Sequence, residues 1–130
     1  MRSVKSIWWC VALLLSCLAA QSANAPSLVG KWISETDTQR VSYEFAKDGS
    51  VFWMYQAGTY WSGIKAKYRL NAQTQPMQLD LYAFSDPDMA DTTLLGIIEF
   101  TAPDKFKLVM AREARPTEFT EQSFEFERAK

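Results

Sequence analysis

The stretch Ile64–Leu70, IKAKYRL, alternates strictly between apolar and charged residues. Successive side chains of a β-strand point to opposite faces, so its four apolar residues share one side of an extended chain and its three cations share the other. The stretch therefore predicts a strand with one face in a core and the other in water. Lys65, Lys67 and Arg69 are interpreted as the solvated outer face.

Seven further runs continue this pattern along the chain, some of them less regularly. They are Gly30–Glu35, Val41–Ala46, Ser50–Gln56, Met77–Ala83, Leu94–Phe100, Lys105–Met110 and Ser123–Glu127. The short connectors carry turn residues, as in Lys47-Asp48-Gly49, where glycine readily adopts a positive φ. No window keeps a 3.6-residue period, so we expect little helix.

Eight sequential strands of similar length predict an all-β fold over residues 27–130. They close most naturally into an eight-stranded antiparallel up-and-down barrel, because closure removes the free strand edges. A two-sheet sandwich built from the same strands is the alternative. No glycine- or proline-rich linker divides the segment, so a single domain is expected.

The amino terminus has the features of a secretory signal. Arg2 and Lys5 precede Ile7–Ala20, an apolar run of fourteen residues without a charge. As a helix this run covers about 21 Å, which is short of the roughly 30 Å of a bilayer core. We therefore expect a signal peptide over residues 1–22 and export to the periplasm.

Three cleavage positions are compatible with this signal. Ala20-Gln21-Ser22 has the small-x-small form, and so has Ala23-Asn24-Ala25, although Pro26 follows it. The stretch Leu14–Cys17 resembles a bacterial lipobox, which makes Cys17 a candidate for lipidation in an outer-membrane-tethered lipoprotein. In the alternative interpretation Cys17 is an apolar residue of the signal, like Cys10, and both interpretations stay open.

Composition excludes several classes of site. The 130 residues contain no histidine, and both cysteines lie in the signal, so the domain has no histidine- or thiolate-based catalytic or metal site. Without Arg2 and Lys5 the 14 basic residues fall to 12 against 15 acidic ones, a net charge of −3 that argues against nucleic acid. Asp86, Asp88 and Asp91 are interpreted as a solvated loop, since Pro87 interrupts them. We expect no enzyme activity, no metal and no cofactor.

The chain resembles a bacterial lipocalin-like domain family. Gly30-Lys31-Trp32 opens the first strand as the G-x-W motif opens a lipocalin-type barrel. The further matching stretches, in order, are Gly58–Tyr60, Lys67–Asn71, Pro76–Leu81, Leu95–Phe100 and Arg115–Phe119. The resemblance implies a calycin-type β-barrel in an exported protein, without an established catalytic activity. It also implies that Trp32 plugs one end of the barrel under a late arginine, for which Arg128 is the first candidate and Arg112 the second.

Aromatic residues supply the candidate ligand site. Trp53 and Tyr55 belong to a strand with bulky groups on both faces, and Tyr60 and Trp61 follow closely. Most inward positions are large, so we expect a small cavity with a ligand at the barrel mouth beside these four residues. The alternative is a thick core beneath a covering loop. Tyr82 and Phe84 fall on the outer face of their strand in this pattern.

Two functions follow as expectations. The first is a non-catalytic, exported binding protein of the cell envelope that takes a small apolar or amphipathic ligand at the barrel mouth. The second is a periplasmic protein-interaction module, such as an inhibitor of a hydrolase or toxin, with Ser85–Asp91 as its protruding loop. In either case we expect a monomer or weak dimer whose only membrane association is through a lipid anchor.

Overall fold

Residues 26–130 are described by the computed structural model, and the predicted signal peptide with Cys17 lies outside them. This part of the chain forms eight strands and one short 3₁₀-helix. The strands are β1 (Gly30–Glu35), β2 (Arg40–Phe45), β3 (Ser50–Ala57), β4 (Tyr60–Asn71), β5 (Met77–Tyr82), β6 (Leu94–Ala102), β7 (Lys105–Ala111) and β8 (Phe124–Arg128). The helix η1 (Pro87–Met89) lies between β5 and β6.

The strands close into one barrel. Each strand pairs antiparallel with the next, and β8 returns to β1 through the pairs Trp32↔Arg128 and Ile33↔Glu127. This confirms the predicted all-β, eight-stranded antiparallel up-and-down barrel. The alternative of a two-sheet sandwich is wrong, because β1 and β8 are paired and the barrel is closed.

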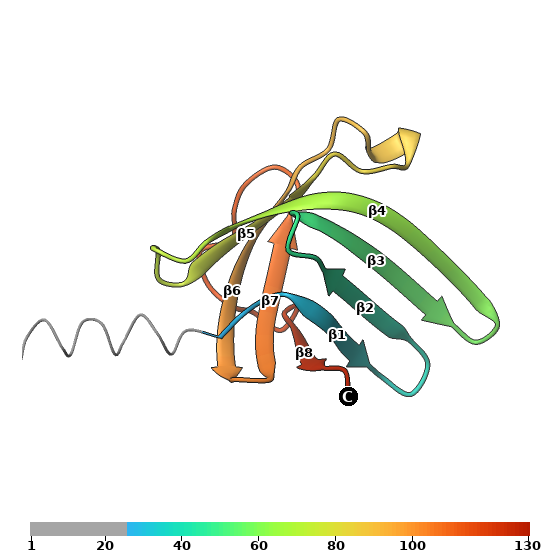
Figure 1. Cartoon of the computed structure of the whole chain (residues 1–130), viewed down its shortest axis with the longest axis horizontal. Helices are drawn as coiled ribbons and strands as arrows, with labels where there is room; N and C mark the ends of the chain where they lie inside the picture. Colours follow the sequence, from blue (N-terminus) through green and yellow to red (C-terminus); the bar gives the residue numbers. More distant parts are fainter. Residues whose placement is uncertain (1–25) are drawn as a thin grey trace, which may run out of the picture.

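The alternating stretch Ile64–Leu70 is the centre of the longest strand, β4. Ala66 is buried, Lys65 and Lys67 are exposed, and the Tyr68 hydroxyl donates a hydrogen bond to the Ala46 carbonyl at 2.7 Å. The strand begins four residues earlier than the alternation predicts. With β3 it forms a long hairpin that projects from the body of the barrel (Figure 1).

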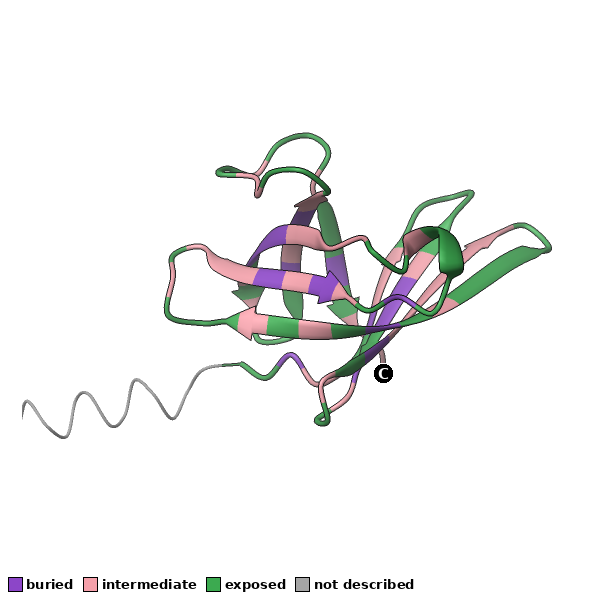
Figure 2. Cartoon of the chain, turned by 90° about the horizontal axis from the view of Figure 1, so that it is seen from above, coloured by how far each residue is buried: buried purple, intermediate pink, exposed green. Residues whose placement is uncertain are grey.

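Large side chains fill the interior. Buried positions lie along the strands, and the hairpin turns and loops are mostly exposed (Figure 2). The largest fully buried side chains are Trp32, Phe45, Phe106, Phe126, Leu79, Leu81 and Ile98. Burying each such side chain stabilises the fold by about 1.5–3 kcal/mol, which lets a domain without a disulfide hold together by its core.

The up-and-down order gives the barrel two different ends. The β1–β2, β3–β4, β5–β6 and β7–β8 connections lie at one end, which we call the open end. The β2–β3, β4–β5 and β6–β7 connections lie at the other, the closed end, where β1 begins and β8 finishes.

Trp32 and Arg128 together cover the closed end. The Trp32 side chain is fully buried, and its Nε1 donates to the Leu28 carbonyl at 2.8 Å. The Arg128 guanidinium donates to the carbonyls of Ser27 and Val29, at 2.9 Å each, and to Asp104 Oδ1 at 3.0 Å. Arg112, the second candidate for this place, is exposed.

Phe84 lies on the opposite side of the barrel wall from the predicted one. Strand β5 ends at Tyr82, and Ala83 has a φ of +54°, which turns the chain. Phe84 is consequently buried in the core, with its ring centroid 6.4 Å from that of Trp53. Only Tyr82 keeps the predicted outer position, where the Arg69 guanidinium lies over its ring at 4.5 Å.

Candidate functional site

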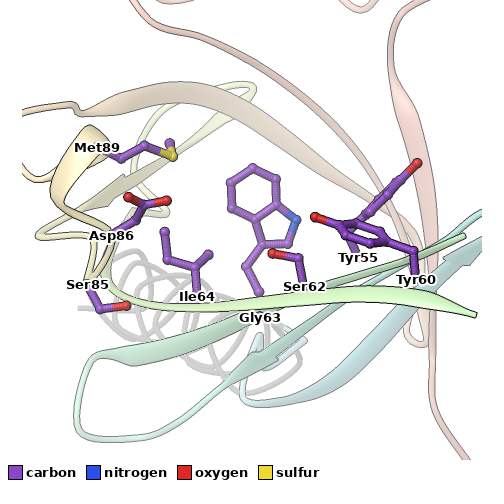
Figure 3. Close-up of a pocket in the computed structure, with 9 residues that line it drawn as sticks. Tyr55, Tyr60, Ser62, Gly63, Ile64, Ser85, Asp86 and Met89 are labelled. Atoms are coloured by element: carbon purple, nitrogen blue, oxygen red, sulfur yellow. The ribbon is translucent and has the colours of Figure 1, made fainter.

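A cavity of about 560 Å³ lies at the open end between the β3–β4 hairpin and the loop that carries η1. We call it the loop cavity. Its lining residues are Trp53, Tyr55, Tyr60, Ser62, Gly63, Ile64, Ser85, Asp86 and Met89. In Figure 3 the rings of Tyr55 and Tyr60 lie together near Ser62, and Asp86 and Met89 lie at the other side of the cavity.

The strand register of the β3–β4 hairpin determines which of its aromatic side chains form a wall of the loop cavity. Tyr55 pairs with Ser62 and Trp53 pairs with Ile64, so these four side chains point to the same face of the sheet. The rings of Tyr55 and Tyr60 pack edge to face with centroids 6.4 Å apart. Strands hold this wall, and it is therefore largely preformed.

Backbone contacts fix the loop opposite the hairpin. Ser85 donates its N–H to the Lys65 carbonyl at 2.8 Å, and its hydroxyl accepts from the Lys65 N–H at 3.0 Å. Asp86 caps η1, because its Oδ1 accepts a hydrogen bond from the Asp88 N–H at 2.9 Å. The Asp86 carboxylate is thereby held at the rim of the loop cavity.

A second cavity, of about 530 Å³, opens inside the barrel beneath the open end. We call it the barrel cavity. Its lining is mainly apolar and consists of Val41, Tyr43, Trp53, Leu94, Leu108, Val109, Met110, Gln122, Phe124 and Phe126. Burial raises the pKa of the Tyr43 phenol well above its usual value, so this group stays neutral at physiological pH.

The β7–β8 loop supplies the last part of this lining. Arg115 donates to the Gly96 carbonyl at 2.8 Å, and the Lys107 ammonium lies 4.7 Å from the centroid of the Phe119 ring. These contacts hold the loop on the outer wall and bring Gln122 and Phe124 to the open end. Phe124 begins β8 at the barrel rim, where it lines the barrel cavity and 55% of it is exposed.

Trp53 is the residue that the two cavities share. Its ring packs against Tyr43, with centroids 5.8 Å apart, and against Phe84 at 6.4 Å. Its Nε1 is buried and has no hydrogen-bond partner in the described structure. Leaving a buried N–H without an acceptor costs about 1–3 kcal/mol, so this donor is an unusual feature that a ligand oxygen would satisfy.

Charge at the two cavities comes from one side chain. Among the residues that line them, Asp86 is the only charged one, and neither lining includes a lysine or an arginine. The remaining polar groups of the loop cavity are the hydroxyls of serine and tyrosine side chains and the Trp53 N–H. These hydroxyl and N–H groups can exchange hydrogen bonds with an uncharged polar group that lies beside the apolar barrel cavity.

The structure brings together three of the four predicted site residues. Trp53, Tyr55 and Tyr60 line the loop cavity, whereas Trp61 does not. Trp61 pairs with Gln56 on the opposite face of the hairpin, and 63% of it is exposed. Counting alternate positions back from Ile64 along β4 would have separated Trp61 from Tyr60.

Sequence reasoning missed the polar part of the site. Ser62 is on the inward side of β4 and could have been found from the same alternation. Asp86 and Met89 lie in a loop whose position depends on its hydrogen bonds to Lys65, twenty residues earlier, and no local pattern indicates that contact. Within residues 26–130 the structure has no group of three histidine, cysteine, aspartate or glutamate side chains that could hold a metal ion.

The barrel is the fold that the lipocalin-like resemblance implies, but a fold by itself does not carry a function. No helix within residues 26–130 has the length and apolar character needed to cross a membrane. Comparison of the chain with models of protein families, with curated proteins and with solved structures finds no significant match.

Proposed function

We propose that this chain is an exported, non-catalytic binding protein of the cell envelope, which takes one small apolar or amphipathic molecule at the open end of its barrel. The observation that carries the proposal is the meeting of two cavities, about 560 and 530 Å³ in volume, at the side chain of Trp53. Each volume lies in the range of roughly 300–1,000 Å³ that is typical of small-molecule sites.

The chemistry of the lining supports an amphipathic ligand. The barrel cavity offers apolar side chains, and each methylene group buried there contributes about 0.8 kcal/mol to binding before the entropic costs of association. The loop cavity offers hydroxyls and one carboxylate beside it. The aromatic side chains packed around Trp32 fill the barrel there and limit how deeply the alkyl chain of a ligand can enter.

A non-catalytic role is consistent with the groups present. General acid-base chemistry is carried out most often by a histidine or a carboxylate positioned on the reacting group. Asp86 is the only carboxylate lining either cavity, and its Oδ1 already accepts a hydrogen bond as the cap of η1. This arrangement favours binding over turnover.

The direct test is a calorimetric titration of the mature protein with twelve-carbon amphiphiles below their micelle concentrations. We expect binding at one site, and we expect Leu94→Trp to abolish it, because the larger side chain fills the barrel cavity. Trp61→Ala is the matched control and should bind normally, since Trp61 lines neither cavity. No binding by any amphiphile, or equal binding by the Leu94→Trp variant, would refute the proposal.

A protein-interaction module is the second candidate, and the hairpin tip favours it. Tyr60 and Trp61 are each 63% exposed where the β3–β4 hairpin projects from the barrel (Figure 1). Exposed tyrosine and tryptophan residues often anchor protein interfaces. Affinity capture from envelope extract tests this function: a hydrolase or toxin retained by the wild type and lost by a Tyr60→Ser/Trp61→Ser variant supports it.

Export is tested separately. We expect the precursor to be processed and the mature protein to appear in the periplasmic or outer-membrane fraction. If Cys17 carries a lipid, Cys17→Ala releases the protein from membranes, whereas Cys10→Ala does not. A soluble wild-type protein that starts at Ala23 rules out the anchor, and an unprocessed protein in the cytosol rules out export.

A further inference from the structure

We propose that the ligand is an acyl chain joined through a carbonyl to an uncharged, hydroxyl-bearing head group, and that its carbonyl oxygen accepts a hydrogen bond from Trp53 Nε1. This inference rests on the proposed function and specifies the chemical class of the ligand. A monoacylglycerol is the simplest molecule of this class. Three separate observations lead to it.

The first observation is the unpartnered donor. Trp53 Nε1 is buried without a hydrogen-bond partner, although its ring is packed between Tyr43 and Phe84. The indole N–H can only donate, so the group that satisfies it must be an acceptor. A carbonyl oxygen meets this requirement, and an alkyl chain or an ammonium group does not.

The second observation is the contrast between the two cavities on which Trp53 borders. The barrel cavity is lined by aliphatic and aromatic side chains such as Leu94, Leu108 and Met110. The loop cavity is lined by the hydroxyls of Ser62 and Tyr60 and by Asp86. A molecule whose carbonyl lies at Trp53 therefore places its acyl chain in the barrel cavity and its head group in the loop cavity.

The third observation is the charge at the head-group side. Asp86 provides a negative charge, and no lysine or arginine lines either cavity to offset it. An anionic head, such as a fatty-acid carboxylate, is repelled there. Head-group hydroxyls can instead donate hydrogen bonds to the free oxygen of Asp86, and such charge-assisted bonds are the stronger kind.

The experiment compares four ligands with one chain length at pH 7.5 and low ionic strength: 1-monolaurin, its ether analogue 1-O-dodecylglycerol, laurate and dodecyltrimethylammonium. We expect monolaurin to bind most tightly. The ether, whose oxygen is a poorer acceptor, should bind about tenfold more weakly, as expected for one lost hydrogen bond. Laurate should also bind more weakly than monolaurin, with a deficit that shrinks as salt screens Asp86.

Two variants separate the donor from the charge. Trp53→Phe keeps an aromatic ring without the N–H, so the affinity for monolaurin should fall about tenfold further than that for dodecyltrimethylammonium, which loses ring contacts alone. Asp86→Asn should raise the affinity for laurate, because it removes the repelling charge, and lower that for monolaurin, because it removes the charge-assisted acceptor of the head-group hydroxyls. The ether comparison is made on the wild-type protein, so it stands even if a variant fails to fold.

The outcomes distinguish this inference from the proposed function. If none of the four ligands binds, the proposed function itself fails. If ligands bind but laurate or the ammonium compound is the tightest, or if the ether equals the ester, the proposed class of ligand is wrong and the binding function stands.

Discussion

The guanidinium of Arg128 lies over the indole of Trp32, with 4.2 Å between its central carbon and the ring centroid. The two residues are also directly paired across β1 and β8, at the seam where the barrel closes. Gly30 makes the approach feasible, since it has a φ of +131° and a Cβ there would lie 2.8 Å from Arg128 Nη1. The contact therefore joins the first strand, the last strand and the segment before Gly30.

Arg128→Lys should destabilise the domain by about 2–3 kcal/mol, because an ammonium cannot bond two carbonyls and a carboxylate while stacking on an indole. The change is measured by urea denaturation. Lys105→Ala is the matched control: it removes the exposed Lys105–Glu127 ion pair between β7 and β8 and should cost less than about 1 kcal/mol. Equal effects of the two substitutions would contradict the closing role of Arg128.

Trp32→Ala should cost about 3–5 kcal/mol, the usual range for truncating a buried large aromatic residue. Trp32 is fully buried: its ring packs against that of Phe106 with centroids 4.6 Å apart, and its Nε1 donates to the Leu28 carbonyl. Denaturation of wild type and variant gives the difference directly. A loss below about 1 kcal/mol would mean that the closed end does not depend on this side chain.

Gly96→Ala should be more costly than Gly63→Ala, although both glycines lie within strands. A Cβ on Gly96 would meet the carbonyl oxygens of Leu79 and Val109 at 3.0 and 3.1 Å, which belong to the sheet and cannot easily move. We expect a loss of about 1–3 kcal/mol for Gly96→Ala, as for other overpacked core positions. Comparison of the two unfolding midpoints checks the order.

Gly63 tolerates alanine better for a specific reason. The atoms nearest to a Cβ there belong to the Phe52 ring, at 2.6 Å and beyond, and this side chain can rotate away on the outer face. We expect a cost below about 1 kcal/mol. A Gly63→Ala variant that is less stable than Gly96→Ala would show that the Phe52 ring is fixed in place.

Alkaline pH should weaken the fold through Tyr43. Burial raises the pKa of its phenol in the folded state, so the stabilisation is complete below the unfolded pKa of about 10 and is lost as pH rises above it. The free energy of unfolding should fall by up to about 1.4 kcal/mol per pH unit there. Tyr43→Phe should have a shallower slope between pH 10 and 11.5, and an unchanged slope would rule out Tyr43 as the cause.

Much of the barrel could be predicted because its signals are local. Alternation in Ile64–Leu70 correctly separates the buried Ala66 from the exposed lysines, and the connectors between the runs fall close to the observed turns. The error at Phe84 has a local cause as well. The alternating pattern continues through Ala83, but the positive φ of Ala83 ends the strand, and an alanine gives no signal of that conformation.

Only those residues of the candidate site that lie on strands could be predicted from the sequence. Tyr55 and Tyr60 could be placed at the open end from the strand order, whereas Asp86 reaches the same cavity through a loop held by Ser85 and Lys65. The missing acceptor at Trp53 Nε1 is a property of the packed structure and has no counterpart in the sequence. Contacts between residues far apart in the chain decide these features, and a single sequence does not display such contacts.

The hydrogen bonds from Arg128 to the carbonyls of Ser27 and Val29 also fix the place where the described chain enters the barrel. Ala129 donates to the Lys31 carbonyl nearby, so both ends of the described chain leave the barrel at the same pole. The open end, with the loop cavity, is at the opposite pole. Any support joined to either end of the described chain, whether a bilayer, a chromatography resin or a sensor chip, therefore stands behind the molecule and leaves the open end facing the solution.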